Sequence, residues 1–236
     1  MSINRESFHN TRITEDQVAL FHQRYPGLVE QTLNIYAVGR NYAAHIRELG
    51  NQKPAEPVLF GKSLSSLSLG PELTFPGHLG AIHHELELVL RIGGEVPIGS
   101  LQGLGCVSHM ALGLDFTARE LQDRLKAAGL PWHAAKSFQD ACFLGPLRKV
   151  ASLEGPFRFK LFVNDQLRQD GDSGHMIFGF EEILASINRS TALWSGDLVF
   201  TGTPAGVGPV ADGDALRLVC EALDTDCRLH VRIAKG

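Results

Sequence analysis

The sequence predicts an α+β domain made mainly of short strands in mostly antiparallel sheet. Of the 236 residues, 25 are glycine, and glycines and prolines separate short apolar runs at 91–105 and 201–214. Such frequent turn residues favour strands joined by turns over a helical bundle. Residues 81–92 alternate polar and apolar side chains, which is the period of a β-strand.

The chain divides into an accessory segment, 1–33, and one domain, 34–236. Residues 13–25 within the segment have the pattern of a short amphipathic helix. The domain opens with a buried strand at 33–39, and a short helix at 40–50 ends at a glycine.

A second apolar run, 107–115, ends in Asp115, and a helix is expected directly after it. Thr117 with Glu120 three residues later is typical of a capping box, and Gly129 follows the last turn. Asp115 is therefore predicted to lie at the end of a strand.

The rest of the chain continues as strands with one helix. A hairpin is predicted with its turn at Asn164 and Asp165. The other expected elements are a helix at 180–190, a strand at 197–204 that runs into a glycine- and proline-rich loop, and a closing pair of strands at 214–223 and 227–234.

Composition and charge exclude several classes of protein. The net charge of −4 gives no electrostatic reason to expect nucleic acid or an anionic membrane as partner. The four cysteines lack C-x-x-C spacing, so they are read as reduced cysteines rather than a disulfide framework or a thiolate zinc site. No signal peptide and no membrane-spanning run is apparent. We therefore expect a soluble, cytoplasmic protein.

The pair Glu85 and Glu87 is the first candidate for chemistry. On one strand these carboxylates share a face, and two like charges side by side call for a cation or a shared proton. A solvated outer face is the commoner explanation of such a pair. Here the strand is otherwise apolar, and Asp115 offers a third carboxylate. Three oxygen donors suit a hard cation, Mg²⁺ or Mn²⁺ (or Ca²⁺), better than zinc.

Further candidates lie on the predicted helices. His45 and Glu48 are neighbours at i and i+3, an arrangement in which the carboxylate raises the basicity of the imidazole. Arg119 and Gln122 have the same spacing and can reach a substrate carboxylate. On spacing alone, ordinary helix-surface polarity is the favoured explanation of either pair. Lys136, in an apolar stretch, either extends to solvent or is a buried functional cation.

Two other patterns have competing explanations. Thr201 and Thr203, with neighbouring backbone N–H groups, form either a small anion site or a tight turn. The segments around His45 and Ser173 echo the histidine and serine segments of trypsin-like proteases, with Asp115 in the right order. The missing disulfides and the unused glutamate pair argue against a protease.

Several motifs, taken in order, resemble the fumarylacetoacetate hydrolase family, in particular its small acylpyruvase and oxaloacetate decarboxylase branch. The resemblance extends from about Tyr36 to the C-terminus. The motifs are VGRNYAAHIRELG, EPVLFGK, HHELELVLRIG, LGLDFTARELQ, GLPWHAAKSF, VNDQLRQDG and LVFTGTPAGVGP. The segment FGKSLSS, where the family more often has F-x-K-P, is a departure that can alter substrate choice.

The resemblance implies stacked mixed β-sheets of the family's β-roll type with a few short helices, in a homodimer. It also implies roles for particular residues. Metal ligands for Mg²⁺ or Mn²⁺ would be Glu85, Glu87 and Asp115; catalytic residues would be His45, Glu48 and Lys136; substrate contacts would be Arg40, Arg119, Gln122 and Thr203.

The function implied is metal-dependent hydrolysis of a C–C bond in an acylpyruvate, acetylpyruvate or fumarylpyruvate, through a metal-bound pyruvate enolate. Decarboxylation or tautomerisation of oxaloacetate would use the same enolate. The alternative enzyme is an isomerase or decarboxylase of 2-hydroxy-dienedioates in aromatic catabolism. A non-catalytic binding protein would be expected to have lost the carboxylates or the histidine–glutamate pair, and this sequence keeps both.

Overall fold

The computed structural model describes residues 34–48, 52–68, 70–150 and 152–235. The predicted helix at 13–25 and the closing glycine of the helix at 40–50 lie outside these residues. The division into segment 1–33 and domain 34–236 stays a prediction. No helix of the described part is long and apolar enough to cross a membrane.

A large mixed sheet forms the centre of the domain, in the order β2-β1-β13-β6-β7-β9-β3 with β10 paired to β7. Its longest strands, β6 and β7, are antiparallel, whereas β1 runs parallel to β13. The strands are β1 (Ile35–Gly39), β2 (Val58–Lys62), β3 (Leu67–Ser68), β6 (Leu86–Ile92), β7 (Val107–Asp115), β9 (Cys142–Leu144), β10 (Arg148–Lys149) and β13 (Leu198–Phe200).

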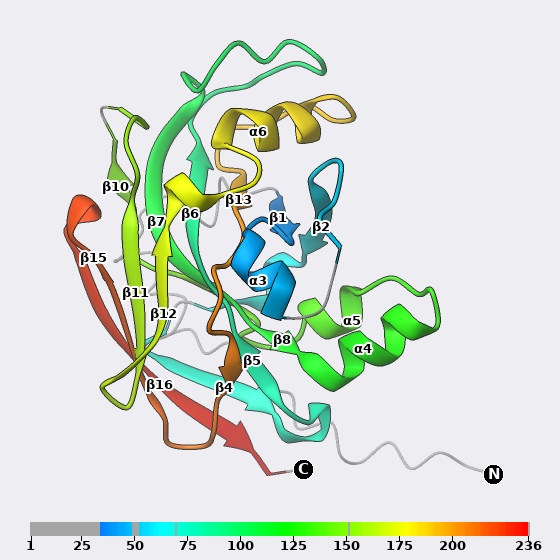
Figure 1. Ribbon diagram of the computed structural model, residues 1–236, viewed down its shortest axis with the longest axis vertical. Coiled ribbons are helices and arrows are strands. Elements are labelled where there is room, and N and C mark those ends of the chain that lie inside the picture. Colours follow the sequence, from blue (N-terminus) through cyan, green and yellow to red (C-terminus); the bar gives the residue numbers. More distant parts are fainter. Residues whose placement is uncertain (1–33, 49–51, 69, 151, 236) are drawn as a thin grey trace. The chain divides into compact units, whose positions relative to one another are not determined.

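A second sheet packs beside the first, in the order β12-β11-β15-β16-β4. Figure 1 shows it alongside β6 and β7. Its strands are β4 (Glu72–Pro76), β11 (Arg158–Val163), β12 (Gln166–Asp172), β15 (Ala215–Cys220) and β16 (Thr225–Ala234). The predicted hairpin is confirmed, and both turn residues, Asn164 and Asp165, have positive φ of 50° and 61°.

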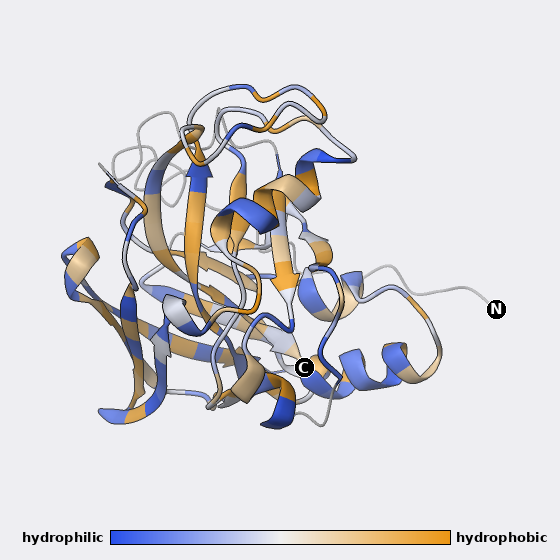
Figure 2. Cartoon of the chain, turned by 45° about the horizontal axis from the view of Figure 1, so that its top comes forward, coloured by the Kyte–Doolittle hydropathy of each residue, from blue (hydrophilic) through white to orange (hydrophobic). Residues whose placement is uncertain are grey.

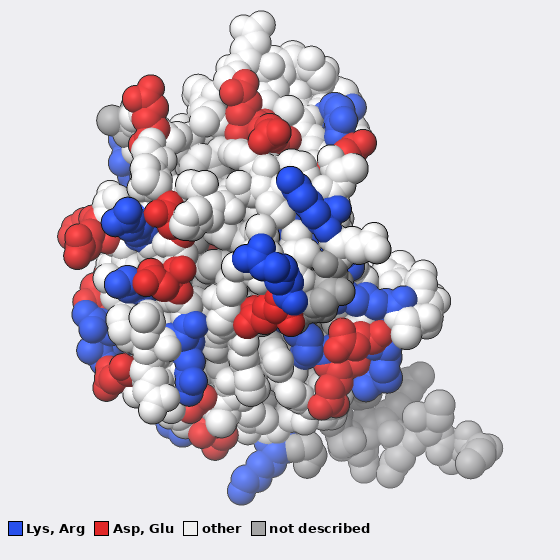
Figure 3. All heavy atoms as spheres, viewed as in Figure 1, with Lys and Arg blue, Asp and Glu red and all other residues white. Residues whose placement is uncertain are grey.

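The core lies between these two sheets. The even-numbered residues of β6 are fully buried, and they belong to one apolar cluster with side chains of β11 and β15 such as Leu161 and Leu218. Figure 2 shows apolar residues concentrated along these strands. Burial of this face is the main stabilising contribution, at about 25 cal/mol per Å² of apolar surface. On the face drawn in Figure 3, acidic and basic side chains are mixed.

Short helices and turns connect the strands. The helices are α3 (Ala43–Glu48), α4 (Arg119–Ala127), α5 (His133–Lys136) and α6 (Phe180–Asn188), with single turns η1 (Leu64–Ser66), η2 (Gly77–Leu79), η3 (Ser173–His175) and η4 (Glu221–Leu223). In Figure 1, α4 and α5 lie on the side of the large sheet away from β11 and β15.

The single strand predicted at 81–92 is in fact two strands in different sheets. β5 (Ile82–His84) pairs with β14 (Gly208–Pro209) and β8 (Thr117–Ala118), and Glu85 stands at the break before β6. Alternation of polar and apolar residues does not show which strand a segment pairs with. The break at Glu85 therefore could not be predicted from this pattern.

The capping box predicted at Thr117 is wrong. Thr117 belongs to β8, α4 begins at Arg119, and the N-cap residue Ala118 makes no side-chain capping bond. The hydroxyl of Thr117 instead accepts a hydrogen bond from Lys136 Nζ at 2.6 Å. The Thr117 oxygen that the sequence motif assigns to capping the helix is therefore bonded to the buried Lys136 instead.

Candidate active site

Three buried carboxylates gather where the two large strands meet the small sheet. Glu85, Glu87 and Asp115 each offer an oxygen, and these oxygens all lie within 4.8 Å of one another. The residues are 6%, 1% and 1% exposed, respectively. The solvated outer face considered for this glutamate pair is therefore not what the structure contains.

Local backbone pairing holds the three carboxylates together. The N–H of Asp115, at the end of β7, donates to the carbonyl of Glu85 at 2.9 Å. The small sheet β14-β5-β8 then ties three distant stretches of chain around this point, since β5 pairs with β8 on one side and β14 on the other. The triad is thus carried on paired strands rather than on free loops.

Three cationic side chains neutralise part of this negative charge. Lys62 Nζ lies 2.6 Å from Asp115 Oδ1, and Lys136 Nζ lies 2.6 Å from Asp115 Oδ2 and 2.8 Å from Glu85 Oε2. Arg119 also pairs with Glu85. Burial by itself raises the pKa of Glu85, but the charges of Lys136 and Arg119 outweigh it and hold that pKa well below its ordinary value.

Glu87 is left as the uncompensated carboxylate. It accepts a hydrogen bond from the Gly202 N–H at 2.6 Å, and no described lysine or arginine pairs with it. Burial raises the pKa of Glu87 well above its ordinary value, and the charges of Asp115 and Glu85 raise it further. A divalent cation would relieve this repulsion, and an all-oxygen donor set fits a hard cation. The buried triad can therefore bind a divalent metal ion.

The histidine–glutamate pair lies beside the triad. His45 Nδ1 is 3.3 Å from Glu48 Oε2, and His45 is 5% exposed, so this is not an ordinary surface pair. Burial lowers the pKa of His45, and the negative charges of Glu85 and Glu48 offset part of that shift. The imidazole is thereby kept neutral near pH 7, as a general base requires.

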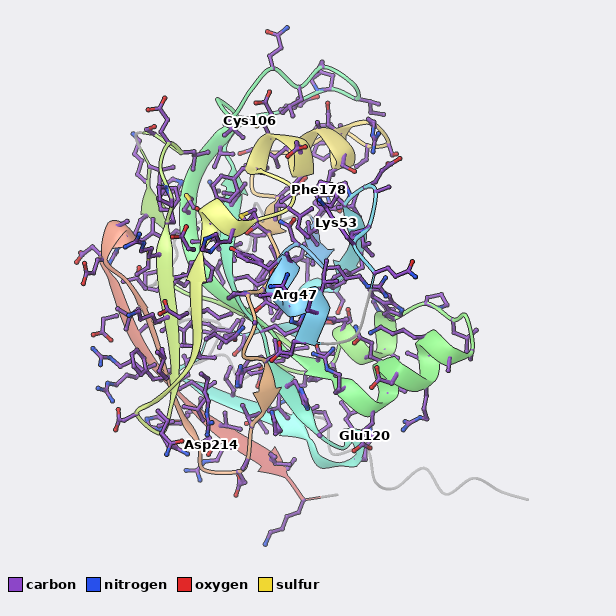
Figure 4. All side chains as sticks on the ribbon, in the orientation of Figure 1. Arg47, Lys53, Cys106, Glu120, Phe178 and Asp214 are labelled. Carbon is purple, nitrogen blue, oxygen red and sulfur yellow. The ribbon has the colours of Figure 1, made fainter. Side chains whose placement is uncertain are left out.

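Contacts at both ends fix the position of α3. Glu48 also accepts from the Gly206 N–H, at 3.1 and 3.2 Å to its two oxygens. Before the helix, the buried side chain of Asn41 donates to the carbonyls of Thr201 and Phe178, at 2.8 and 3.1 Å, and accepts from Phe178 N. Figure 4 shows Phe178 above Arg47, which lies on α3. The histidine is therefore held by the loop after β13 and the segment before α6.

Arg119 and Gln122 also belong to the interior of the site. Arg119 Nη1 donates to Gln122 Oε1 at 2.7 Å, and Gln122 is 4% exposed. The Nε–H of Arg119 is buried and has no hydrogen-bond partner among the described residues. An orphaned donor of this kind costs free energy unless a ligand accepts from it.

Lys136 is buried, so it does not extend to solvent. Its Nζ donates to Glu85, Asp115 and Thr117. An ammonium has three N–H groups, so all of them are taken by the protein. Burial opposes the charge on Lys136, but Asp115 and Glu85 outweigh it and raise its pKa. Lys136 therefore acts as a fixed positive charge.

The loop after β13 is mainly structural. The hydroxyls of Thr201 and Thr203 donate to the carbonyls of Leu88 and Leu86, at 3.0 and 2.9 Å. Thr203 still lines the pocket, but its hydroxyl proton is already used. The small-anion site considered for the two threonines is therefore not formed by their hydroxyl donors.

One pocket collects almost every predicted site residue. All of the predicted residues except Glu48 and Asp115 line it, and each of those two contacts a lining residue. The lining members are Arg40, His45, Glu85, Glu87, Arg119, Gln122, Lys136 and Thr203.

Lys62, Asn41 and Gln169 support the site and were missed as functional residues in the sequence. Lys62 sits in a strand whose other residues are apolar or glycine, which is a weak signal of a buried partner. Gln169 Oε1 accepts from Leu86 N at 2.9 Å, and its Nε2 donates to Thr203 Oγ1 and the Pro204 carbonyl at 2.7 and 3.0 Å. In the sequence this residue looks like an ordinary polar residue of a hairpin.

Replacing Gln169 with alanine should destabilise the protein by about 2–4 kcal/mol, because several buried polar groups lose their partner at once. Urea unfolding of the metal-free protein measures this. The matched control is Gln166→Ala at an exposed position of β12, which should change the free energy of unfolding by less than about 0.5 kcal/mol. Equal stability of the two variants would contradict the role assigned to Gln169.

A buried acidic triad and a histidine–glutamate pair that meet around one pocket, with an orphaned arginine donor beside them, are features typical of an enzyme active site. Comparison with known proteins agrees. Residues 34–231 match the family model of the fumarylacetoacetate hydrolase C-terminal domain. The chain therefore belongs to the fumarylacetoacetate hydrolase family, and its stacked mixed sheets are the family's fold.

Curated relatives and solved structures cover most of the chain. It is 39% identical to the mitochondrial oxaloacetate tautomerase FAHD1 of Bos taurus over 188 residues, 78% of this chain and 85% of that protein. It is 38% identical to the mitochondrial oxaloacetate decarboxylase of Dictyostelium discoideum over 208 residues, 85% and 94% respectively. The structure of fumarylpyruvate hydrolase from Pseudomonas aeruginosa, in complex with Mn²⁺ and pyruvate, matches with a TM-score of 0.80 at 33% identity, covering 86% of this chain and 91% of that one.

Proposed function

We propose that this chain is a divalent-metal-dependent enzyme acting on short 2-oxo acids, and that it hydrolyses acylpyruvates. The observation that carries the proposal is that Glu85 and Glu87 of the acidic triad line one pocket together with His45 and with Arg119, whose Nε–H is unpaired. The related hydrolase with Mn²⁺ and pyruvate supports it.

Glu85, Glu87 and Asp115 would hold Mg²⁺ or Mn²⁺. When bound there, the cation supplies Lewis acidity that polarises the oxygens of a 2-oxo acid. Arg119 lines the pocket, and its unpaired Nε–H would donate to the substrate carboxylate, a charge-assisted bond of the stronger kind.

The histidine–glutamate pair would activate water. Glu48 accepts from the Nδ1–H of His45, which leaves Nε2 free to take a proton. The hydroxide oxygen bonds to the acyl carbonyl carbon, and the bond from that carbon to the methylene of the pyruvate unit breaks. His45 returns its proton to the departing pyruvate. Lys136 contributes its fixed positive charge to the oxygens that become negative.

Tautomerisation or decarboxylation of oxaloacetate is a second candidate reaction, favoured by the identity to relatives with those activities in their names. Neither reaction needs attack by water, since a proton moves or CO₂ leaves instead. Glu48 would then matter less than in hydrolysis. Both reactions can belong to one pocket.

The test is a substrate panel with and without metal. We expect turnover of acetylpyruvate or fumarylpyruvate with Mg²⁺ or Mn²⁺, loss of activity by more than about 100-fold after EDTA, and recovery when the metal is restored. Oxaloacetate is assayed in parallel by its enol absorbance. Full activity after EDTA would refute metal dependence, and turnover of 2-hydroxy-dienedioates alone would favour the isomerase instead.

We also propose an oligomeric state and a location in the cell. The chain is expected to form a homodimer, and light scattering after size exclusion would measure its mass. A cytoplasmic location is checked by fractionation, and it contrasts with the mitochondrial proteins among the relatives.

A further inference from the structure

The pocket holds more positive charge than its carboxylates neutralise. Four cationic residues line it. Two of them, Lys136 and Arg119, pair with members of the acidic triad. The other two, Arg40 and Lys126, make no ion pair with a carboxylate of the pocket among the described residues.

Lys126 is not a simple surface lysine. Its nearest carboxylate, Asp123, is 3.8 Å away with a side chain 64% exposed, and an exposed pair of this kind contributes little. The lysine side chain is 26% exposed, and Nζ lies 5.4 Å from the centroid of the Trp132 ring. Burial lowers the pKa of Lys126, and the charges of Arg119 and Arg40 lower it further. Arg40, Arg119 and Lys126 line the same pocket, so three cations face one space, an arrangement that an incoming anion would relieve.

The rings of Phe60 and Trp132 form an aromatic wall of the same pocket that Arg40 and Lys126 line. Lys136 Nζ lies 4.9 Å from the centroid of the Phe60 ring, and the Phe60 and Trp132 centroids are 6.0 Å apart. Lys126 Nζ lies over the Trp132 ring. Gly39 lies against Trp132, since a Cβ added at this glycine would be 3.7 Å from the indole ring, and Arg40 lines the same pocket as this wall. The wall thus leads from the triad to the outer cations across two rings.

We propose that Arg40 and Lys126 form a distal anion subsite that binds the second carboxylate of an extended dicarboxylic 2-oxo acid. The inference rests on the proposed function, because the triad end must hold the 2-oxo acid group. The chain between the two carboxylates would lie along Phe60 and Trp132, whose faces favour a flat, conjugated segment.

Binding of two non-hydrolysable probes tests the subsite without turnover. 2-Oxoheptanedioate and 2-oxoheptanoate have equal length and differ in the distal carboxylate. Calorimetry with Mg²⁺ should show the dicarboxylate binding more tightly by roughly 10-fold to 100-fold, the range of one or two charge-assisted hydrogen bonds. Lys126→Gln and Arg40→Gln should each reduce this ratio by about 10-fold. The control, Arg124→Gln on the exposed part of the same helix, should leave the ratio unchanged.

Kinetics give a second measurement. The ratio of kcat/KM for fumarylpyruvate to that for acetylpyruvate should fall by about 10-fold in Lys126→Gln and further in Lys126→Glu. If both probes bind the wild-type protein equally, the subsite is refuted and the proposed function stands. If neither probe binds, both proposals fail. An unchanged ratio in both Lys126 and Arg40 variants also refutes the subsite.

Discussion

Replacing Glu87 with glutamine should strongly weaken divalent-cation binding while the chain stays folded. The substitution removes one of three charged oxygen donors, and ligand charge sets the affinity of such sites for hard cations. We expect the affinity for Mn²⁺, measured by calorimetry, to fall by roughly 100-fold, and turnover of any 2-oxo acid to fall by on the order of 10³-fold.

The effect on folding should have the opposite sign. In metal-free protein Glu87 is repelled by Asp115 and Glu85, and glutamine keeps an oxygen to accept from Gly202 N. The thermal midpoint in EDTA should therefore stay the same or rise. The control Glu95→Gln changes the same charge at an exposed loop position and should leave metal affinity intact. Wild-type Mn²⁺ affinity in Glu87→Gln would rule out this residue as a ligand.

Replacing His45 with alanine should lower acylpyruvate hydrolysis by roughly 10²–10⁴-fold, the usual contribution of a general base. Metal affinity should be retained, because the triad lies on other elements. Steady-state assays give the rate, and calorimetry with Mn²⁺ gives the affinity. The control is His78→Ala at an exposed position. Hydrolysis at the wild-type rate in His45→Ala would exclude this imidazole as the base.

The pH dependence of the wild-type enzyme follows from the same residue. A general base must be neutral, so kcat/KM is lost as pH falls through the pKa of His45 in the folded protein. Burial lowers that pKa from its ordinary value of 6.5, so the acid limb of the profile should lie below pH 6.5. Because Glu48 raises the pKa of His45, Glu48→Gln should move the limb to still lower pH. A limb above 6.5 would contradict the assignment.

Most of the strand elements could be predicted from sequence because each is a local pattern. The alternation around Glu87, the apolar run into Asp115 and the Asn164–Asp165 turn all depend on neighbours within a few residues. The grouping of the three carboxylates was also within reach, because two share one short segment and the third ends the run that pairs with it in space.

The supporting residues could not be predicted because their partners are distant in sequence. Lys62 reaches Asp115 across 53 residues, and Gln169 reaches Leu86 across 83. The apolar strand around Lys62 is only a weak local sign that this lysine is buried, and it does not identify the carboxylate with which the lysine pairs. The break at Glu85 has the same cause, since the partners that separate β5 from β6 come from other parts of the chain.

The parallel pairing of β1 with β13 has a consequence for how the site is assembled during folding. Asn34, just before β1, hydrogen-bonds to Asp197, just before β13, across 163 residues. During synthesis, the hairpin-like β6 and β7 can form early, because their contacts are close in sequence. The strand preceding His45, β1, can pair with β2 early, but the two join the rest of the large sheet only once β13 has emerged. The acidic triad should therefore come together before His45 is delivered to it, and we expect the long sequence separation of β1 and β13 to make that last closure the slow step.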